Sequence, residues 1–377
     1  MGEPPGGPPD FDPPVILSIT PDSGAVIEGF DDDVIIKFDE VINERSGNGL
    51  DKLVLVSPRA KEIKVSWKRS AIAIKPKDGW HRDVVYQVTL LRGIADLRNN
   101  RLDSTRTVIF STGGEIPATK VSGTVLNWEQ GRSAPRALVE LIVLPDSLVY
   151  FTEADSVGDF TFSAVPPGQY LLIGTIDKNG NHERDRREWF DSTTVQLDSA
   201  VSGELWAFAH DSVGPRVRNA VLVDSITIRI SFTQMLQPGV PPDTAVDLLL
   251  LPDSQAVAIA NVWTAATYDS VKTVEDSLKR SAQAAAAEQP ADSAEVQAPS
   301  PVDTAAQAVL APATTDTSRI AGLLATRPKL AADLHLRLVS AVVPGAKYLI
   351  LARVANVLGN VEESQAVLAV PAAADST

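Results

Sequence analysis

The residues most able to do chemistry in this sequence lie in one stretch, Asp177–Glu188, and the chemistry they favour is the binding of a hard cation. Side-chain oxygens fall at the first, third, fifth, ninth and twelfth positions of the stretch, the spacing with which an EF-hand loop wraps calcium. Glu183, at the seventh position, could add a main-chain carbonyl. We therefore predict calcium as the cofactor, with these ligands: Asp177, Asn179, Asn181, Glu183, Asp185 and Glu188.

Two features of this stretch depart from the calcium-loop pattern. Its sixth position is His182, where the sharp turn of such a loop favours glycine, although Gly180 stands nearby. The preceding segment, Tyr170–Ile176, has the composition of a strand rather than of a helix. An exposed hairpin with its turn at Asn179-Gly180 is therefore the alternative interpretation.

Three tryptophans are candidates for a different kind of site. Trp80, Trp128 and Trp189 stand near predicted loops, where their rings could stack on sugars. Large aromatic rings also commonly cap the ends of β-sandwiches, and the sequence leaves both interpretations open.

The remaining polar residues do not form a recognisable catalytic set. The sequence has no cysteine, which excludes disulfides, zinc–thiolate sites and thiol nucleophiles, and its four histidines are scattered. Neither a hydrolase nucleophile elbow nor a phosphate-binding glycine loop is present. The acidic residues Asp31–Asp33, Asp39 and Glu40 fit a solvated strand edge. We expect no enzyme; a hydrolase would need a pocket with converging carboxylates.

Composition narrows the class of partner. The formal charge of −14 argues against DNA or RNA, because phosphate binding needs a basic surface. No apolar run has the length of a spanning helix. Met1–Pro9 lacks the basic and apolar regions of a signal peptide and reads as a Gly/Pro-rich tether.

Alternating hydrophobic residues predict that strands position these side chains. Val34, Ile36 and Phe38 alternate with Ile35 and Lys37, and Ile228, Ile230 and Phe232 alternate with Arg229 and Ser231. In the latter segment Thr227, Arg229 and Ser231 are expected to point away from the core. Turn dipeptides such as Asp78-Gly79 separate the strands, a pattern typical of β-sandwiches.

The expected fold is all-β, a tandem array of Ig-like and prealbumin-like β-sandwiches. The turn after Tyr86, ending in Asn99-Asn100, has a counterpart after Tyr348, ending in Gly359-Asn360, which indicates an internal repeat. The predicted parts are a flexible tether (1–12), a first module (13–114), a second module (118–211) and a third module (213–268 plus 329–371).

The third module is expected to carry a long insertion at 269–328. Ala, Ser, Thr, Asp and Pro dominate there, and such a segment buries too little apolar surface to offset its ordering entropy. We expect disorder, apart from a short helix at the start, where Val271, Val274 and Leu278 share a helical face.

The first module resembles the bacterial Ig-like domain of surface-layer proteins. The resemblance rests on Pro13-Pro14, on Ser18–Gly24 with its Pro-x-x-Gly turn, on Val34–Phe38 and on the closing Phe110–Gly113. The family's turn before the last strand corresponds to Asp96–Asn100, with Asn99 in place of glycine. The third module is similar but lacks the proline-rich opening and has Asn356 at the acidic position.

The second module resembles the carboxypeptidase regulatory-like, or prealbumin-like, domain. Val121–Val125, Gly158-Asp159-Phe160 and Pro167-Gly168-Gln169-Tyr170 carry that resemblance, which implies no peptidase activity. Chains with this order of modules look like lipoproteins of Gram-negative bacteria, in which a Gly/Pro tether follows a lipidated cysteine. The resemblance thus implies an extracytoplasmic location in the cell envelope, as an outer-membrane lipoprotein or a periplasmic protein. Membrane association would come only through an N-terminal lipid whose cysteine this sequence lacks.

These observations lead to one expected function and one alternative. We expect a non-catalytic structural or interaction protein of the cell envelope, whose modules act as spacer and docking surface, stiffened by calcium. Its partner would be an envelope protein or a glycan, not a nucleic acid. The alternative is an array of carbohydrate-binding modules on the cell surface, which a sandwich fold permits but cannot establish.

Overall fold

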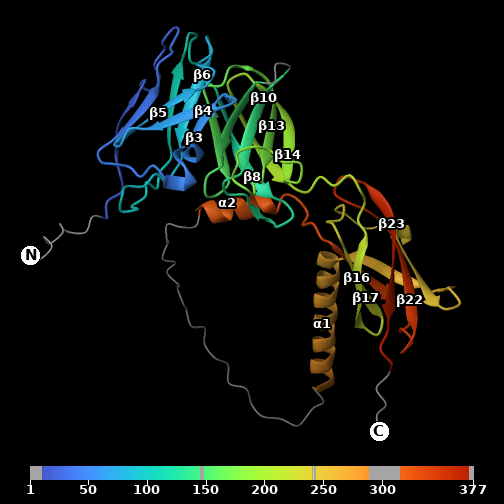
Figure 1. The fold of residues 1–377 in the computed structure, drawn as a ribbon. Coiled ribbons are helices and arrows are strands. Elements are labelled where there is room, and N and C mark those ends of the chain that lie inside the picture. Colours follow the sequence, from blue (N-terminus) through green and yellow to red (C-terminus); the bar gives the residue numbers. More distant parts are fainter. Residues whose placement is uncertain (1–10, 145–147, 240, 242, 288–314, 373–377) are drawn as a thin grey trace, which may run out of the picture. The chain divides into compact units, whose positions relative to one another are not determined.

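A computed structural model describes residues 11–144, 148–239, 241, 243–287 and 315–372 (Figure 1). The chain is nearly all β, with 46% strand and 11% helix, so the predicted fold class is confirmed. It forms two compact units: Met1–Asn127 with Ser133–Ala209, and Trp128–Arg132 with His210–Thr377. The first unit holds the first two modules and the second unit holds the third. In the described part of the chain, no helix is both long and apolar enough to cross a membrane.

The first module is a sandwich of two antiparallel sheets. One sheet has the strand order β1-β2-β5-β4 and the other the order β3-β6-β7. The elements are β1 (Ile16–Thr20), β2 (Val34–Phe38), η1 (Ser46–Asn48), η2 (Leu50–Leu53), β3 (Val54–Ser57), β4 (Ile63–Trp67), β5 (Ala71–Pro76), β6 (Val85–Leu90) and β7 (Arg106–Ser111).

The core of this module lies between its two sheets. Val34, Ile36 and Phe38 of β2 are buried while Lys37 is exposed, as the period-two pattern predicts. Trp80 packs edge-on against Tyr86 and Phe110, with ring centroids 4.8 and 5.3 Å away. This aromatic cluster fills one end of the sandwich, where large rings bury the most apolar surface.

The second module has sheets in the order β11-β10-β13-β14 and β12-β8-β15, with β9 also paired to β8. Strands β8 and β15 run parallel, so a long excursion through the other sheet separates them. Gly123 lets these strands approach closely, because a Cβ there would lie 1.8 Å from the carbonyl oxygen of Gly203. The strands are β8 (Lys120–Asn127), β9 (Arg132–Ser133), β10 (Leu138–Val143), β11 (Val149–Glu153), β12 (Asp159–Ser163), β13 (Gly168–Thr175), β14 (Phe190–Leu197) and β15 (Ala200–Ala207).

Arg59 lies at the junction of the first and second modules. Its Nη2 donates to Oε1 of the buried Glu140 on β10 at 2.9 Å, and its guanidinium lies 4.5 Å from the ring centroid of Phe151 on β11. Two further hydrogen bonds cross the junction: Arg59 N–H donates to the Val149 carbonyl at 2.7 Å, and Phe151 N–H donates to Ser57 Oγ at 3.0 Å. Leu138 and Phe151 also join the core of the first module, so the two sandwiches share packing.

The third module repeats the topology of the first. Its sheets have the orders β16-β17-β21-β20 and β19-β18-β22-β23, which match those of the first module apart from the short β19. Its elements are β16 (Val217–Asp224), β17 (Thr227–Phe232), η3 (Asp243–Ala245), β18 (Val246–Leu251), β19 (Gln255–Ala256), β20 (Ile259–Thr264), β21 (Asp333–Leu338), β22 (Lys347–Ala355) and β23 (Val361–Ala369).

The repeated turn before the last strand has the same hydrogen bonds in both modules. Asp96 Oδ1 accepts from the N–H groups of Arg98 and Asn100 at 2.9 and 2.7 Å. Asn356 Oδ1 accepts from the two equivalent N–H groups at 3.0 Å each. Asn356 has an amide in place of the second carboxylate oxygen, and its Nδ2 donates to the carbonyls of Asp211 and Val213, where the third module begins. One side-chain oxygen is therefore enough to build the turn.

The insertion of the third module lies between β20 and β21, and both of its described ends are helical. Helix α1 (Ala265–Ala287) follows β20 directly, and α2 (Thr315–Leu324) precedes β21 (Figure 1). The helix expected at the start of the insertion is present as α1, but it continues to Ala287, and α2 forms near the end of the insertion. The prediction of disorder over 269–328 is therefore wrong for the rest of α1 and for α2. Residues 288–314 lie outside the described part, as do residues 1–10 of the predicted tether.

Helix α1 covers the outer face of the sheet that contains β17 and β21. Tyr268 stacks on His335 of β21 with ring centroids 4.1 Å apart, and Glu275 forms a two-bonded ion pair with Arg337. Arg337 lies directly opposite Thr227 in the sheet, so the two side chains share that face. Thr227 was expected to point away from the core; its side chain is nevertheless fully buried, on the face that it shares with Arg337.

Candidate functional site

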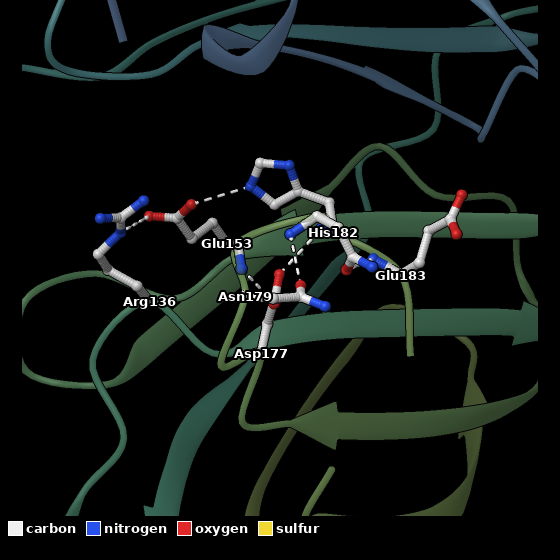
Figure 2. Close-up of polar contacts among 8 residues, drawn as sticks. Arg136, Glu153, Asp177, Asn179, His182 and Glu183 are labelled. Atoms are coloured by element: carbon white, nitrogen blue, oxygen red, sulfur yellow. Dashed lines mark hydrogen bonds and ion pairs between the residues drawn. The ribbon is translucent and has the colours of Figure 1, made fainter. Parts of the chain in front are cut away.

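The predicted cation loop leaves the end of β13 and is held together by side chains that accept from its own backbone. Asp177 Oδ1 accepts from Gly180 N–H at 2.7 Å, and its Oδ2 accepts from His182 N–H at 2.8 Å (Figure 2). Asn179 Oδ1 and Asn181 Oδ1 each accept from the N–H two residues further on, at 3.0 and 2.8 Å. These successive Asx turns wind the chain around the side-chain oxygens.

The loop turns sharply at the sixth position despite the absence of glycine there. His182 has φ +57°, and Gly180 has φ +69°. A left-handed conformation is uncommon outside glycine, and histidine is among the residues that tolerate it best. The departure noted in the sequence is thus accommodated by the backbone.

The far end of the loop returns to its beginning through Glu188, whose side chain is buried. Glu188 Oε1 accepts from Lys178 N–H at 2.8 Å, and Oε2 accepts from Asp185 N–H at 3.1 Å. Asp185 Oδ2 accepts from Asn179 Nδ2 at 2.8 Å. In contrast, Glu183 points its carboxylate away from Asp177 (Figure 2), which is compatible with the main-chain role predicted for that residue.

A second group of charges braces the loop against β11. Glu153 Oε2 lies 3.2 Å from His182 Nε2, and Glu153 Oε1 accepts from Arg136 Nε at 3.0 Å (Figure 2). Burial raises the pKa of Glu153, but the hydrogen bonds and charges of His182 and Arg136 outweigh it, and the net pKa lies below the usual range. Glu153 is therefore an anion over the physiological pH range and fixes the side chain of His182.

The oxygen-rich loop fits calcium in the type of its donors. A carboxylate oxygen that accepts one N–H bond keeps a second lone pair for a cation, and hard oxygen ligands are those that calcium prefers. However, no group of three or more His, Asp or Glu side chains among the described residues is arranged so that it could hold a metal ion. The donor types and the backbone turn match a calcium loop, whereas the acidic side chains do not converge in this conformation.

A polar cleft of about 700 Å³ lies beside the loop, within the first unit. The loop, the end of β11 and the segment before β10 form one wall; η1, η2 and the segment after β6 form the other. Its charged lining consists of Lys52, Arg92, Arg101, Arg136 and Lys178, with Glu153 and Asp177. We call this the basic cleft. The sequence did not suggest it, because its cations are distant in sequence and no motif connects them.

The tryptophans singled out in the sequence occupy different surroundings. Trp80 belongs to the core of the first module, and its Nε1 donates to the Asp32 carbonyl at 2.9 Å. Trp189 is partly buried, with Lys178 Nζ 4.3 Å from its ring centroid. Trp128 is also partly buried. The acidic run behaves as a solvated edge, with Asp31 exposed and paired to Lys75 at 3.0 Å.

A comparison with known protein families gives a match for the first module. Residues 10–112 match the family described as the bacterial Ig-like domain. The first module is a bacterial Ig-like domain. The search of curated proteins found no match.

The search of solved structures found matches at low similarity. They include the N-terminal part of the bacterial S-layer protein SbsC, at 15% identity and TM-score 0.19, covering 52% of this chain and 44% of that one. The major pilin subunit BcpA of Bacillus cereus follows at 12% identity and TM-score 0.20, covering 52% and 71%. The Bacillus anthracis TIE protein has 8% identity and TM-score 0.19, covering 98% and 57%. The chain thus spans less than half of the S-layer fragment's length.

The bacterial Ig-like domain supports a structural or interaction role at the bacterial surface, outside the cytoplasm. The carboxylates of the basic cleft agree with such a role. Glu153 is bound to His182 and Arg136, and Asp177 accepts two backbone N–H groups.

Proposed function

We propose that this protein is a non-catalytic structural and interaction protein of the cell envelope, in which the sandwich modules act as a spacer and as a docking surface. The observation that carries the proposal is the junction around Arg59. A spacer must keep its modules at a fixed angle, and this junction joins two sandwiches through a partly buried ion pair, hydrogen bonds from the backbone and a shared core.

The chemistry of the junction favours a fixed connection over a hinge. Glu140 is only 8% exposed while the modules are packed together, so its ion pair with Arg59 is largely shielded from solvent and salt. Inter-domain contacts within a chain are commonly small and polar, and such contacts permit motion. Here Phe151 and Leu138 add apolar burial to the polar contacts.

We further propose that calcium stiffens the Asp177–Glu188 loop. A cation bound only by the folded protein stabilises it by mass action, by about 2.7 kcal/mol at a hundredfold excess over Kd. The test is calorimetric titration of the full chain with calcium, alongside melting curves in calcium and in EDTA. We expect binding that Asp177→Ala and Glu188→Ala abolish and that Asp198→Ala, on an exposed carboxylate outside the loop, preserves. Absence of binding at millimolar calcium would leave the loop as a hairpin held by its own hydrogen bonds.

The finer location is also a proposal: an outer-membrane lipoprotein, or a periplasmic protein, tethered through its Gly/Pro-rich N-terminal segment. The test is fractionation of the native organism, combined with protease treatment of intact cells and an antibody to this chain. A membrane-associated, protease-sensitive protein would support surface exposure. A protected, membrane-associated protein would support a scaffold that faces the periplasm, and a cytosolic protein would refute the envelope function.

A further inference from the structure

We propose that the basic cleft binds an anionic oligosaccharide, a short glycan that carries carboxylate or phosphate groups. This inference goes beyond the spacer function and does not depend on it. It starts from the distribution of charge. The whole chain has a formal charge of −14, yet five basic side chains and only two carboxylates line this cleft. A concave wall of one sign concentrates the field and attracts ions of the opposite sign.

The two carboxylates of the cleft reduce this positive field only in part. Glu153 is matched by Arg136 and Asp177 by two backbone N–H groups. Arg92 is exposed and forms no ion pair within the described part of the chain, and the ion pair of Lys52 is a loose one, 3.9 Å from its own neighbour Asp51. Arg92 and Lys52 lie on the wall opposite the loop, so each is available to an incoming anion.

The shape and polarity of the cleft favour a glycan over other anions. Its volume of about 700 Å³ lies within the range of small-ligand sites, roughly 300–1,000 Å³, and exceeds what a single inorganic anion fills. The apolar lining is limited to Leu53, Leu91 and Pro135, and no aromatic residue takes part. A peptide would need an apolar anchor or a free strand edge, whereas sugar hydroxyls can pair with the basic side chains and the exposed backbone that line the cleft.

Two of the seven non-glycine residues with a left-handed backbone in the described part of the chain line this cleft. Arg136 has φ +60° and His182 has φ +57°, and both line it. Left-handed conformations at residues other than glycine persist where the surroundings impose them, and they gather at binding sites. Glu153 contacts both side chains and thereby holds two of the strained positions together. The cleft is therefore formed before a ligand arrives.

The test is isothermal titration of the full chain with trigalacturonate, phosphorylated maltotriose and neutral maltotriose at low salt. We expect one or both anionic sugars to bind and the neutral sugar not to bind. Tighter binding of trigalacturonate would assign a carboxylated glycan, and tighter binding of the phosphorylated sugar a phosphorylated one. The double variant Lys52→Gln/Arg92→Gln should weaken binding about tenfold or more, because the loss of each charge-assisted hydrogen bond lowers the affinity several-fold.

The matched control is Lys64→Gln/Arg106→Gln, which removes the same charge from exposed strand positions of the same module, away from the cleft. This variant should bind like the unmodified chain, and both variants should melt at similar temperatures. Equal weakening in the two variants would overturn the proposal, because the attraction would then come from overall charge. It would also be overturned if neither anionic sugar bound, or if hexaglutamate bound as tightly as the sugars. None of these results would bear on the junction around Arg59 or on the location of the protein.

Discussion

Replacing Arg59 by alanine is the perturbation that most directly tests whether the first two modules form one mechanical body. The change removes the 2.9 Å bond to Glu140 and the guanidinium that lies over Phe151, and it leaves the backbone hydrogen bond of residue 59 in place. It therefore removes the charged side chain from the junction while the backbone keeps its conformation there.

The expected cost follows from the burial of the two partners. Removing one partner of a fully buried ion pair costs about 3–5 kcal/mol. Arg59 keeps 27% of its side chain exposed, and Arg184 Nε lies 3.9 Å from the other oxygen of Glu140, so part of that cost is avoided. The lost contact with Phe151 adds about 0.5–1 kcal/mol. We therefore expect Arg59→Ala to lower the free energy of unfolding by about 2–3 kcal/mol.

The assay is urea denaturation of the full chain, followed by tryptophan fluorescence, within a double-mutant cycle that includes Glu140→Gln. Glu140→Gln should cost less than Arg59→Ala, because a neutral amide tolerates the loss of its charged partner. The coupling energy should be about 1–2 kcal/mol. If Arg59→Ala costs less than about 0.5 kcal/mol, or if the two changes are additive, the junction does not couple the modules. The fixed-spacer function would then lose its structural support.

Three further results are expected. In a urea titration, Trp80→Ala should lower the free energy of unfolding by about 3–5 kcal/mol, because it empties the aromatic core. Trp67→Ala, at an exposed edge position, should lower it by about 1 kcal/mol. Equal losses in the two variants would contradict this. Asp96→Ala should lower the free energy of unfolding by about 2–3 kcal/mol and Asp96→Asn by about 1 kcal/mol, because the single side-chain oxygen of Asn356 is enough to build the same turn in the third module. If Asp96→Asn were as destabilising as Asp96→Ala, the two turns would not be equivalent. Burial lowers the pKa of His335 in the folded state, so the unfolded chain binds the proton more readily and stability should fall as the pH drops below about 6.5. His335→Phe should flatten that fall between pH 7 and pH 5, and an unchanged pH dependence would contradict it.

Local patterns were enough to predict the strands and the internal repeat. The period of two at Val34–Phe38 appears directly as alternating burial, since sandwich strands have one face in the core. The turn of the first module could be matched to that of the third because its hydrogen bonds are local: Asp96 bonds to residues two and four positions away. The turn chemistry of the cation loop was visible in its spacing for the same reason.

What the sequence could not reveal depends on contacts between distant segments. Arg59 and Glu140 are 81 residues apart, and nothing in either neighbourhood marks them as partners. The cations of the basic cleft come from both modules, so their convergence exists only after the sandwiches dock. Helix α1 was expected to be short, because propensity alone does not show which surface a helix will cover, and its ion pair with Arg337 on β21 joins residues 62 positions apart.

The position of the insertion between β20 and β21 has a practical consequence for protein engineering. The equivalent place in the first module is the short hairpin between β4 and β5, where Lys68 N–H donates to the Ala71 carbonyl. One copy of this topology already carries a large segment at that corner without losing the pairing of the flanking strands. Because loop closure becomes only slowly more costly with length, the β4–β5 corner is a natural grafting point. A reporter or an affinity tag placed there would be displayed on an otherwise unaltered scaffold.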